Sequence, residues 1–313
     1  MNTQETAALL KRMDRVLLLT HVRPDGDTIG SASALCLALR DMGKEAYLLY
    51  NAEITDTYRP YAETLWAPED YQPSYVVSVD VAVENLLPKN AAPYLGSIAL
   101  AIDHHESHGF FAKETCLDAG AAACGEIIYE ILKDMTPLTQ EIAMRLYVAV
   151  STDTGCFVYS NTTPHTHLVA AALMETGIQI APVNNLLFRT KSRTRLAMES
   201  RMVAEMETFH EGKVVVTKIP LALREELHAT DTDIEELSTL APMVEGNICG
   251  ITLRELAPGR IKVSVRATGV NASDVCRPLG GGGHAGAAGA TVEGTMTEVR
   301  DAVLRSVESL VSF

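Results

Sequence analysis

Several features of membrane, secreted and zinc-binding proteins are missing from this sequence. No apolar run approaches the roughly 20 residues that a membrane-spanning helix needs. Residues 1–11 are polar and amphipathic and lack the apolar core of a signal peptide. The six cysteines show neither a Cys-x-x-Cys pair nor the spacing of a zinc site. We therefore expect a cytoplasmic protein with reduced, mostly buried thiols and no membrane partner.

Positive charge is also scarce. The chain has 26 lysines and arginines against 40 aspartates and glutamates, and its formal net charge is −14. Binding to long duplex nucleic acid neutralises many phosphates with basic side chains, so this composition argues against it. A small phosphorylated ligand in a local basic pocket is still compatible with it, because bound divalent cations would offset nearby acidic groups. Basic residues are concentrated in one run, which comprises Arg189, Lys191, Arg193 and Arg195. Such a run is more typical of a solvated surface, and its role stays open.

The length of 313 residues exceeds one ordinary hydrophobic core and favours two domains. Residues from 15 to about 180 alternate short apolar runs with helical patterns, which predicts an α/β fold with a doubly wound, mainly parallel sheet. Three β-type runs and a final helix then indicate a smaller mixed α/β domain. We expect a metal-binding catalytic domain over 1–185, a connector over 186–205 and a substrate-binding domain over 206–313.

Aspartate and histidine are concentrated in four short stretches of the first half. Three of them follow apolar runs of strand type, and the fourth follows a run of helical character. The stretches supply His21, Asp25 and Asp27, then Asp80, then Asp103, His104 and His105, and finally Asp153. Residues just past the carboxyl ends of strands in an open α/β sheet meet in one crevice. Acidic and imidazole groups gathered there would repel one another without a cation, so the pattern predicts a metal centre.

Taken alone, the first stretch is equally compatible with a metal site and with a solvated loop whose aspartates act as caps. The adjacent histidines His104 and His105 lower the weight of that alternative, because such a pair is awkward to bury at a strand end. Carboxylate and imidazole ligands suit Mn²⁺, with Mg²⁺ or Co²⁺ as substitutes. Two such ions about 3.5–4 Å apart can share a bridging carboxylate and activate a water for attack on phosphorus. A helix predicted over 28–42 adds N-terminal backbone donors for a phosphate oxygen.

A second candidate site is the run of four glycines from Gly280 to Gly283, followed by His284. Each glycine costs roughly 0.5–1 kcal/mol relative to alanine in a regular element, so such a run indicates close approach of the backbone to a ligand. Consecutive N–H groups bind anions, and His284 adds a side-chain donor. A flexible surface loop is the alternative, although the flanking Leu279 and alanine-rich segment make it less attractive.

These motifs, in this order, resemble those of the DHH phosphoesterases. The chain contains HxxPDxDxxGS at His21–Ser31, the strand-end Asp80, DHH at Asp103–His105 and Thr-Asp-Thr-Gly at Thr152–Gly155. Residues 280–289 resemble the GGGHxxAAG signature of the DHH-associated domain. Motif order and length together resemble the stand-alone NrnA-type branch, the nanoRNases and pAp phosphatases, and the likeness covers essentially the whole chain.

The resemblance implies a role for each of these residues. One metal ion would be bound by His21 and Asp25, a second by Asp27, His104 and Asp153, with Asp80 bridging both. The catalytic residues would be His105, which contacts the substrate phosphate or assists the leaving group, and Asp103, which orients a ligand imidazole. Loop capping and direct ligation are alternatives for Asp103. Substrate would be bound by Arg266, Gly281, Gly282, Gly283 and His284, although Ala267 stands where many relatives have serine.

The implied activity is a Mn²⁺-dependent phosphoesterase that degrades short oligoribonucleotides, removes the 3′-phosphate of pAp, or does both. The smaller domain would close over the metals, where His108 could contact a base or sugar and Tyr159 and Asn161 could line the cleft. Competing readings are hydrolysis of pApA or c-di-AMP, cleavage of pyrophosphate or polyphosphate, and a non-catalytic nucleotide-binding module. We expect short RNA or small phosphorylated nucleotides as partners, and we leave a homodimer open.

Overall fold

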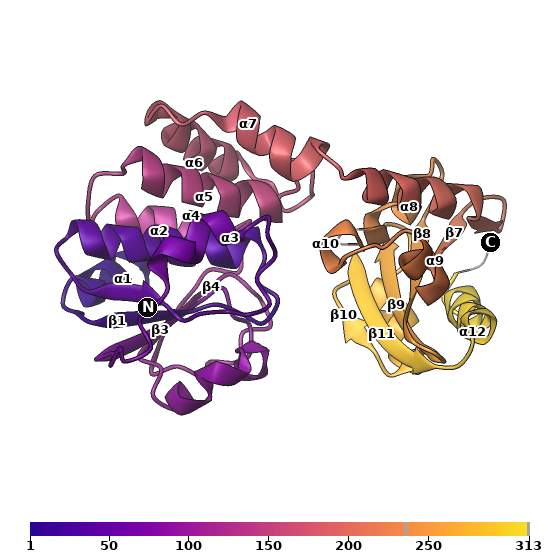
Figure 1. Cartoon of the computed structure of the whole chain (residues 1–313), viewed down its shortest axis with the longest axis horizontal. Coiled ribbons are helices and arrows are strands. Elements are labelled where there is room, and N and C mark those ends of the chain that lie inside the picture. Colours follow the sequence, from indigo (N-terminus) through magenta and orange to yellow (C-terminus); the bar gives the residue numbers. More distant parts are fainter. Residues whose placement is uncertain (235–236, 312–313) are drawn as a thin grey trace. The chain divides into compact units, whose positions relative to one another are not determined.

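The computed structural model describes residues 1–234 and 237–311, and the chain forms two compact units, Met1–Thr190 and Lys191–Phe313 (Figure 1). The first unit carries the aspartate- and histidine-rich stretches, and the second carries the glycine run.

A five-stranded parallel sheet forms the centre of the first unit. Its strands follow the order β2-β1-β3-β4-β5, and each neighbouring pair is parallel. Their bounds are β1 Val16–Leu19, β2 Ala46–Leu48, β3 Tyr75–Val79, β4 Leu100–Asp103 and β5 Glu114–Leu117. Because these strands are parallel, the carboxyl ends of β1, β3 and β4 lie at one edge of the sheet, where most of the predicted site residues follow. The predicted α/β class, with a parallel sheet and a second mixed domain, is confirmed.

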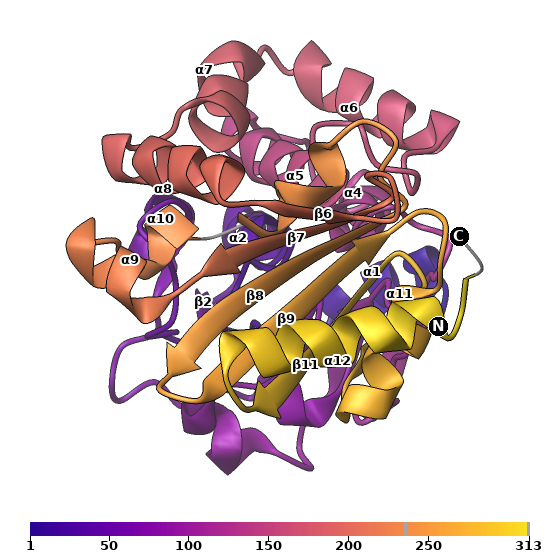
Figure 2. The same ribbon diagram turned by 90° about the vertical axis from the view of Figure 1, so that its right-hand side faces the viewer.

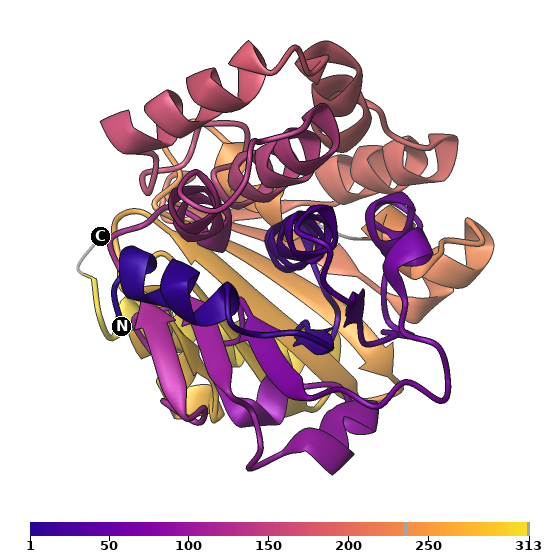
Figure 3. The ribbon, with the colours of Figure 1, turned by 90° about the vertical axis from the view of Figure 1, so that its left-hand side faces the viewer.

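Alternation along the strands divides the apolar side chains of the first unit into two clusters. Val16 and Leu18 on β1 face a large core that includes side chains of helices on one side of the sheet, whereas Leu17 and Leu19 face a smaller cluster on the other. The helices are α1 Thr3–Leu10, α2 Gly26–Asp41, α3 Arg59–Ala62, α4 Cys124–Leu132, α5 Gln140–Asp153, α6 Pro164–Glu175 and α7 Ile180–Asn184 (Figure 3). The 3₁₀ helices Glu84–Leu86 and Lys89–Tyr94 belong to the side of the smaller cluster.

Glycines allow the helices around the site to approach one another closely. A Cβ atom added to Gly26 would lie 2.3 Å from Oγ1 of Thr152, and one added to Gly30 would lie 2.4 Å from the carbonyl oxygen of Arg145. A Cβ atom on Gly125 of α4 would lie 2.6 Å from Cβ of Ala149. These contacts seat α2 and α4 against α5, and that packing brings the end of α5 to the beginning of α2.

The second unit is built on a six-stranded sheet in the order β10-β11-β9-β8-β7-β6, in which only β7 and β8 pair in parallel among the described strands. Its strands are β6 Glu207–Phe209, β7 Val214–Ile219, β8 Cys249–Ala257, β9 Arg260–Ala267, β10 Gly282–Gly283 and β11 Ala287–Glu293. Its helices are α8 Arg193–Ala204, α9 Leu221–Glu226, α10 Asp231–Ile234, α11 Ala272–Cys276 and α12 Met296–Glu308. Figure 2 shows α12 lying across one face of this sheet, where it shares an apolar cluster with β8 and β9.

Within the described ranges, the helices are too short or too polar to cross a bilayer. All six cysteines are free thiols, and five of them are buried.

Gly30→Ala will test the packing of α2 on α5. Alanine favours a helix by about 1 kcal/mol over glycine, but here its Cβ atom would meet the backbone of Arg145, which cannot rotate away. We expect a net loss of about 1–3 kcal/mol in the free energy of unfolding, measured by urea denaturation. Gly120→Ala is the matched control, because its added carbon meets only the end of the Asp118 side chain. Equal stability of the two variants would contradict the packing argument.

Candidate metal centre

Seven side chains from separate parts of the first unit converge at the edge of its sheet. They follow β1, begin α2, follow β3 and β4, and end α5. Their ligand atoms form groups that lie within 4.8 Å of one another: His21, Asp25 and Asp80; Asp27, His104 and Asp153; and Asp80, His104 and His105. The structure therefore brings together all six residues for which the sequence predicted a metal-binding role.

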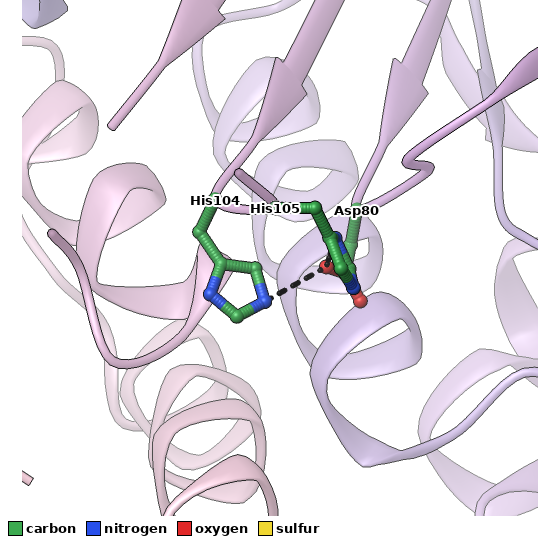
Figure 4. Close-up of side chains that lie close together, drawn as sticks. All are labelled: Asp80, His104 and His105. Atoms are coloured by element: carbon green, nitrogen blue, oxygen red, sulfur yellow. Dashed lines mark ion pairs between the residues drawn. The ribbon is translucent and has the colours of Figure 1, made fainter. Parts of the chain in front are cut away.

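Asp80 lies between the imidazoles of His21 and His104, and each of its oxygens faces one of them. Figure 4 shows the contact between Asp80 and His104, with His105 beside them. Oδ1 of Asp80 is 3.5 Å from Nε2 of His104, and Oδ2 is 3.9 Å from Nε2 of His21. These separations are longer than hydrogen bonds and are compatible with a shared cation between the two atoms. Oδ1 is buried and accepts no hydrogen bond from the described part of the chain. A buried carboxylate oxygen without a donor requires another partner, and a metal ion is one.

The imidazoles of His21 and His104 are both held so that Nε2 points into the site. Nδ1 of His21 is 2.8 Å from the carbonyl oxygen of Val22, and Nδ1 of His104 is 3.2 Å from that of Ala121. Donation from Nδ1 leaves the lone pair of Nε2 for a metal, which is the usual arrangement of a ligand histidine. Nε2 of His104 also faces Oδ2 of Asp27 at 3.8 Å and Oδ2 of Asp153 at 3.6 Å.

Asp25 and Asp27 also organise the helices from which they project. Oδ1 of Asp25 accepts the N–H groups of Asp27 and Thr28 and so caps α2. These two amides are therefore occupied, so a phosphate could bind them only by displacing Asp25, and the predicted phosphate contact at the start of α2 stays a prediction. The carboxylate of Asp27 accepts the N–H groups of Cys124 at 2.6 Å and Gly125 at 2.9 Å, at the N-terminus of α4. Asp27 thus links two helices as well as facing His104.

The electrostatics of the site favour a cation. Burial, reinforced by neighbouring carboxylates, raises the pKa of Asp27 and Asp80 well above the usual range for aspartate. Burial also raises the pKa of Asp153. Without a cation these groups would take up protons, whereas divalent ions would keep them ionised. The donor set of carboxylate oxygens and imidazole nitrogens, without a thiolate, fits Mn²⁺ or a similar ion.

Left-handed backbone conformations occur around the centre at residues other than glycine. The φ angle is 52° at Arg23 and 59° at Asp80. It is 55°, 58° and 68° at Gly155, Cys156 and Phe157, directly after Asp153. Each non-glycine residue in this region costs about 1–3 kcal/mol, and such strain is commonly found at functional sites. These conformations were not predicted from the sequence.

The Asn161 side chain holds the strained turn after α5. Its Nδ2 atom donates to the carbonyl oxygens of Asp153 at 3.1 Å and Ala122 at 2.9 Å. Asn161 therefore fixes the backbone next to a proposed ligand. Tyr159 is 51% exposed, and its ring lies against Gly155, so a role for it in lining the cleft stays a prediction.

Asp103 does not orient a ligand imidazole as expected. Its carboxylate contacts the rings of His105 and His108, both at 2.7 Å, whereas the ring of His104 is held by Ala121. Burial alone would raise the pKa of Asp103, but these hydrogen bonds lower it below its usual value. The side chain of His108 is completely buried, so the expectation that it contacts a base or sugar is wrong.

In the second unit, the fold itself explains three of the four consecutive glycines. Gly280 has a φ angle of 75°, and a Cβ atom on Gly281 would lie 2.2 Å from the carbonyl oxygen of Gly289. Gly283 combines a φ angle of 149° with a contact of 2.6 Å to the carbonyl oxygen of Ala287. Gly282 is exposed, and a Cβ atom there would have no neighbour within 4 Å among the described residues. The contacts of the described residues give no reason for glycine at 282.

Two further features surround this glycine run. His284 is exposed between β10 and β11, and Arg266 is half-buried on β9, opposite Ala287 of β11. A cavity of about 470 Å³ is lined by residues 267–271 together with Ala285 and Gly286. The basic connector, in contrast, is partly neutralised, because Lys191 and Arg195 both pair with Glu199.

Comparisons with known proteins agree with this arrangement. Residues 15–150 match the DHH family, N-terminal domain, and residues 211–312 match the DHHA1 domain. The chain is 33% identical to the bifunctional oligoribonuclease and PAP phosphatase NrnA of Thermus thermophilus, over 96% of this chain and 92% of that protein. It is 26% identical to the Bacillus subtilis protein of that name, over 95% of each.

The fold also resembles a solved structure. An exopolyphosphatase-related protein from Bacteroides fragilis superposes with a TM-score of 0.88 at 20% identity, covering 98% of this chain and 95% of that one. At this level of identity the likeness concerns the fold alone.

Mn²⁺ binding by the Asp80 variant will test the metal centre. In the metal-free protein, Mn²⁺ at 100 times its dissociation constant adds about 2.7 kcal/mol of stability, or a shift of about 5–10 °C in Tm. We expect Asp80→Asn to retain at most about a third of that shift, because a neutral amide cannot bridge two cations. The metal-free variant should be at least as stable as wild type, since it lacks a buried acid. Exposed Asp70→Asn is the control, and an unchanged Mn²⁺ response in Asp80→Asn would contradict the assignment.

Proposed function

Because this chain belongs to the DHH family of phosphoesterases, we propose that it hydrolyses short oligoribonucleotides and the 3′-phosphate of pAp with the help of two Mn²⁺ ions. The names of the Thermus thermophilus and Bacillus subtilis relatives support these substrates, and both alignments extend over nearly the whole chain. The acidic net charge of −14 disfavours long nucleic acids and supports the choice of short ones. The free, mostly buried thiols are compatible with the reducing cytoplasm.

The observation that carries the proposal is the division of the Asp80 carboxylate between two imidazoles. We assign His21 and Asp25 to one ion, Asp27, His104 and Asp153 to the other, and Asp80 to both. Mg²⁺ and Co²⁺ accept the same donors and are substitutes for Mn²⁺. Divalent ions held there would supply Lewis acidity, which lowers the pKa of a water and offsets negative charge at the phosphoryl group.

The side chain of His105 is the candidate proton carrier. Its Nδ1 atom is engaged by Asp103, so Nε2 is the nitrogen left for a substrate oxygen. About a third of the side chain is exposed, at 33%, which gives a substrate access to it. We propose that Nε2 holds a proton for the phosphate or for the leaving oxygen. This nitrogen can serve both ester types, because each releases an oxygen that gains negative charge.

We assign substrate-phosphate binding in the second unit to the backbone around Gly282, with His284 and Arg266. The amides of Gly280, Gly281 and His284 donate to the carbonyl oxygens of Arg277, Cys276 and Ala287, so the positive charge would come from Arg266 and the side-chain donor from His284. Gly282 would let a phosphate approach the backbone closely. Two competing activities, hydrolysis of pApA or c-di-AMP and hydrolysis of pyrophosphate, would need the same metal centre as the proposed activity. A non-catalytic module would be expected to lack one of the metal-binding side chains, yet each of the six predicted positions carries an aspartate or a histidine.

A substrate panel will test this function. The Mn²⁺-loaded protein should hydrolyse pAp and oligoribonucleotides of about two to five residues faster per end than an oligonucleotide of about 24 residues. pApA, c-di-AMP and pyrophosphate complete the panel, and Asp80→Asn is the inactive control. Equal rates per end on short and long RNA would contradict the length preference, and turnover of pyrophosphate alone would contradict the substrate class.

Gly282→Ala will test the phosphate-binding turn. The added carbon meets no described neighbour, so Tm should stay at the wild-type value while KM for pAp rises about tenfold, or ~1.4 kcal/mol. Gly281→Ala is the matched contrast, because its Cβ atom would collide with Gly289 and lower Tm. An unchanged KM in Gly282→Ala would show that this glycine does not approach the substrate.

A further inference from the structure

The imidazole of His108 is buried, and within the described residues its ring forms one hydrogen bond, to Asp103 of the DHH motif. Its side chain is 0% exposed, and Nδ1 lies 2.7 Å from Oδ2 of Asp103. Its Nε2 atom has no partner in the described part of the chain. Nδ1 is therefore the nitrogen that donates to Asp103, because a buried N–H at Nε2 would lack an acceptor.

The two oxygens of Asp103 have different partners. Oδ1 accepts the backbone N–H groups of His104 and His105 as well as Nδ1 of His105. Oδ2 has His108 as its hydrogen-bond donor, and no other described residue donates to it. The Asp103 side chain is fully buried, so without His108 this oxygen would have neither a protein donor nor solvent. The backbone amides hold Oδ1 and His108 holds Oδ2, so His108 completes the set of contacts that fixes the orientation of the carboxylate.

The orientation of Asp103 matters because a second carboxylate competes for the same N–H of His105. Nδ1 of His105 lies 2.7 Å from Oδ1 of Asp103 and 3.6 Å from Oδ1 of Asp80. That oxygen of Asp80 has no described hydrogen-bond donor of its own. If Asp103 turned away, the N–H could move to Asp80. His105 would then change its direction, and Asp80 would lose part of its capacity for cations.

Packing keeps His108 in place. Its ring meets Phe110 edge-on at 5.2 Å between centroids and lies 5.3 Å from the ring of Phe111. Phe111 packs against the smaller apolar cluster of the first unit. The backbone turn is closed by His108 N–H donating to the carbonyl oxygen of His105, and Gly109 N–H donates to that of Ala82. The imidazole can therefore neither swing out to solvent nor exchange Asp103 for another acceptor nearby.

We propose that His108 is a positioning residue for phosphoester hydrolysis: by holding Oδ2 of Asp103, it keeps Nδ1 of His105 on Asp103 and its Nε2 directed at the substrate. The kinetic part of this inference rests on the proposed function, whereas the hydrogen-bond arrangement can be measured without any substrate.

The experiment combines imidazole nitrogen NMR of the metal-free protein with kinetics of the Mn²⁺-loaded enzyme. His108→Leu removes the donor, and His108→Asn places an amide nitrogen as many bonds from the backbone as Nδ1. Wild-type spectra should show both His105 and His108 protonated at Nδ1. In His108→Leu, we expect the Nδ1 protonation of His105 to be partly lost and kcat to fall about 10–100-fold with KM unchanged. His108→Asn should restore the wild-type tautomer and most of kcat.

Phe111→Leu is the matched control, because it loosens the packing around His108 and keeps the hydrogen bond. It should lower Tm without changing the tautomer of His105 or kcat. A wild-type spectrum with His105 or His108 protonated at Nε2 alone would overturn the proposal, and so would an unchanged tautomer or kcat in a folded His108→Leu protein. If the wild-type enzyme hydrolyses none of the panel, the proposed function fails, and the spectra still decide the hydrogen-bond arrangement.

Discussion

The concentration of negative charge around Asp80 is the constraint on which the rest of the first unit depends. Four carboxylates lie near only two imidazoles whose free nitrogens face them, and Asp80 has an oxygen without a donor. Water cannot neutralise such buried groups, so they must be either protonated or bound to cations. The backbone accepts an unfavourable φ angle of 59° at Asp80, which turns the side chain back toward both histidines. Cation binding and the local fold are therefore linked.

The same carboxylates hold the helices together. Asp25 caps α2, and Asp27 satisfies amides at the start of α4, where Ala123 has no side chain that could do so. The glycines of the first motif allow α2 to approach α5, and the end of α5 carries Asp153. A substitution at Asp27 would thus disturb helix packing and the metal site together. Asp80 is the better position for separating them, because it caps no helix and its loss removes a buried charge.

Motif order along the sequence was sufficient to predict the parallel sheet and the convergence of the six side chains, because strand ends in such a sheet share one edge. Motif order was insufficient where the role or conformation of a residue depends on a single contact. The position of His108, three residues after the DHH motif, suggested that it contacts a base or sugar, yet aromatic side chains pack against it. The strand β11 lies in an alanine- and glycine-rich segment with low strand propensity, and its long pairing with β9 determines its conformation. The left-handed turn after Asp153 has no compositional signal beyond Gly155.

The two adjacent histidines of the DHH motif show how hydrogen-bond acceptors assign chemistry to identical side chains. Nδ1 of His104 is held by the carbonyl oxygen of Ala121, which directs Nε2 toward three carboxylates. Nδ1 of His105 is held by Asp103, and its ring is tilted by 59° from that of His104. A neutral carbonyl orients an imidazole without changing its charge, which suits a metal ligand. A buried carboxylate is a stronger acceptor and holds the ring of His105 more firmly, which suits a group that must present Nε2 to a substrate. The acceptor behind each ring therefore separates the proposed ligand from the proposed acid, and His108 matters because it holds the second of these acceptors.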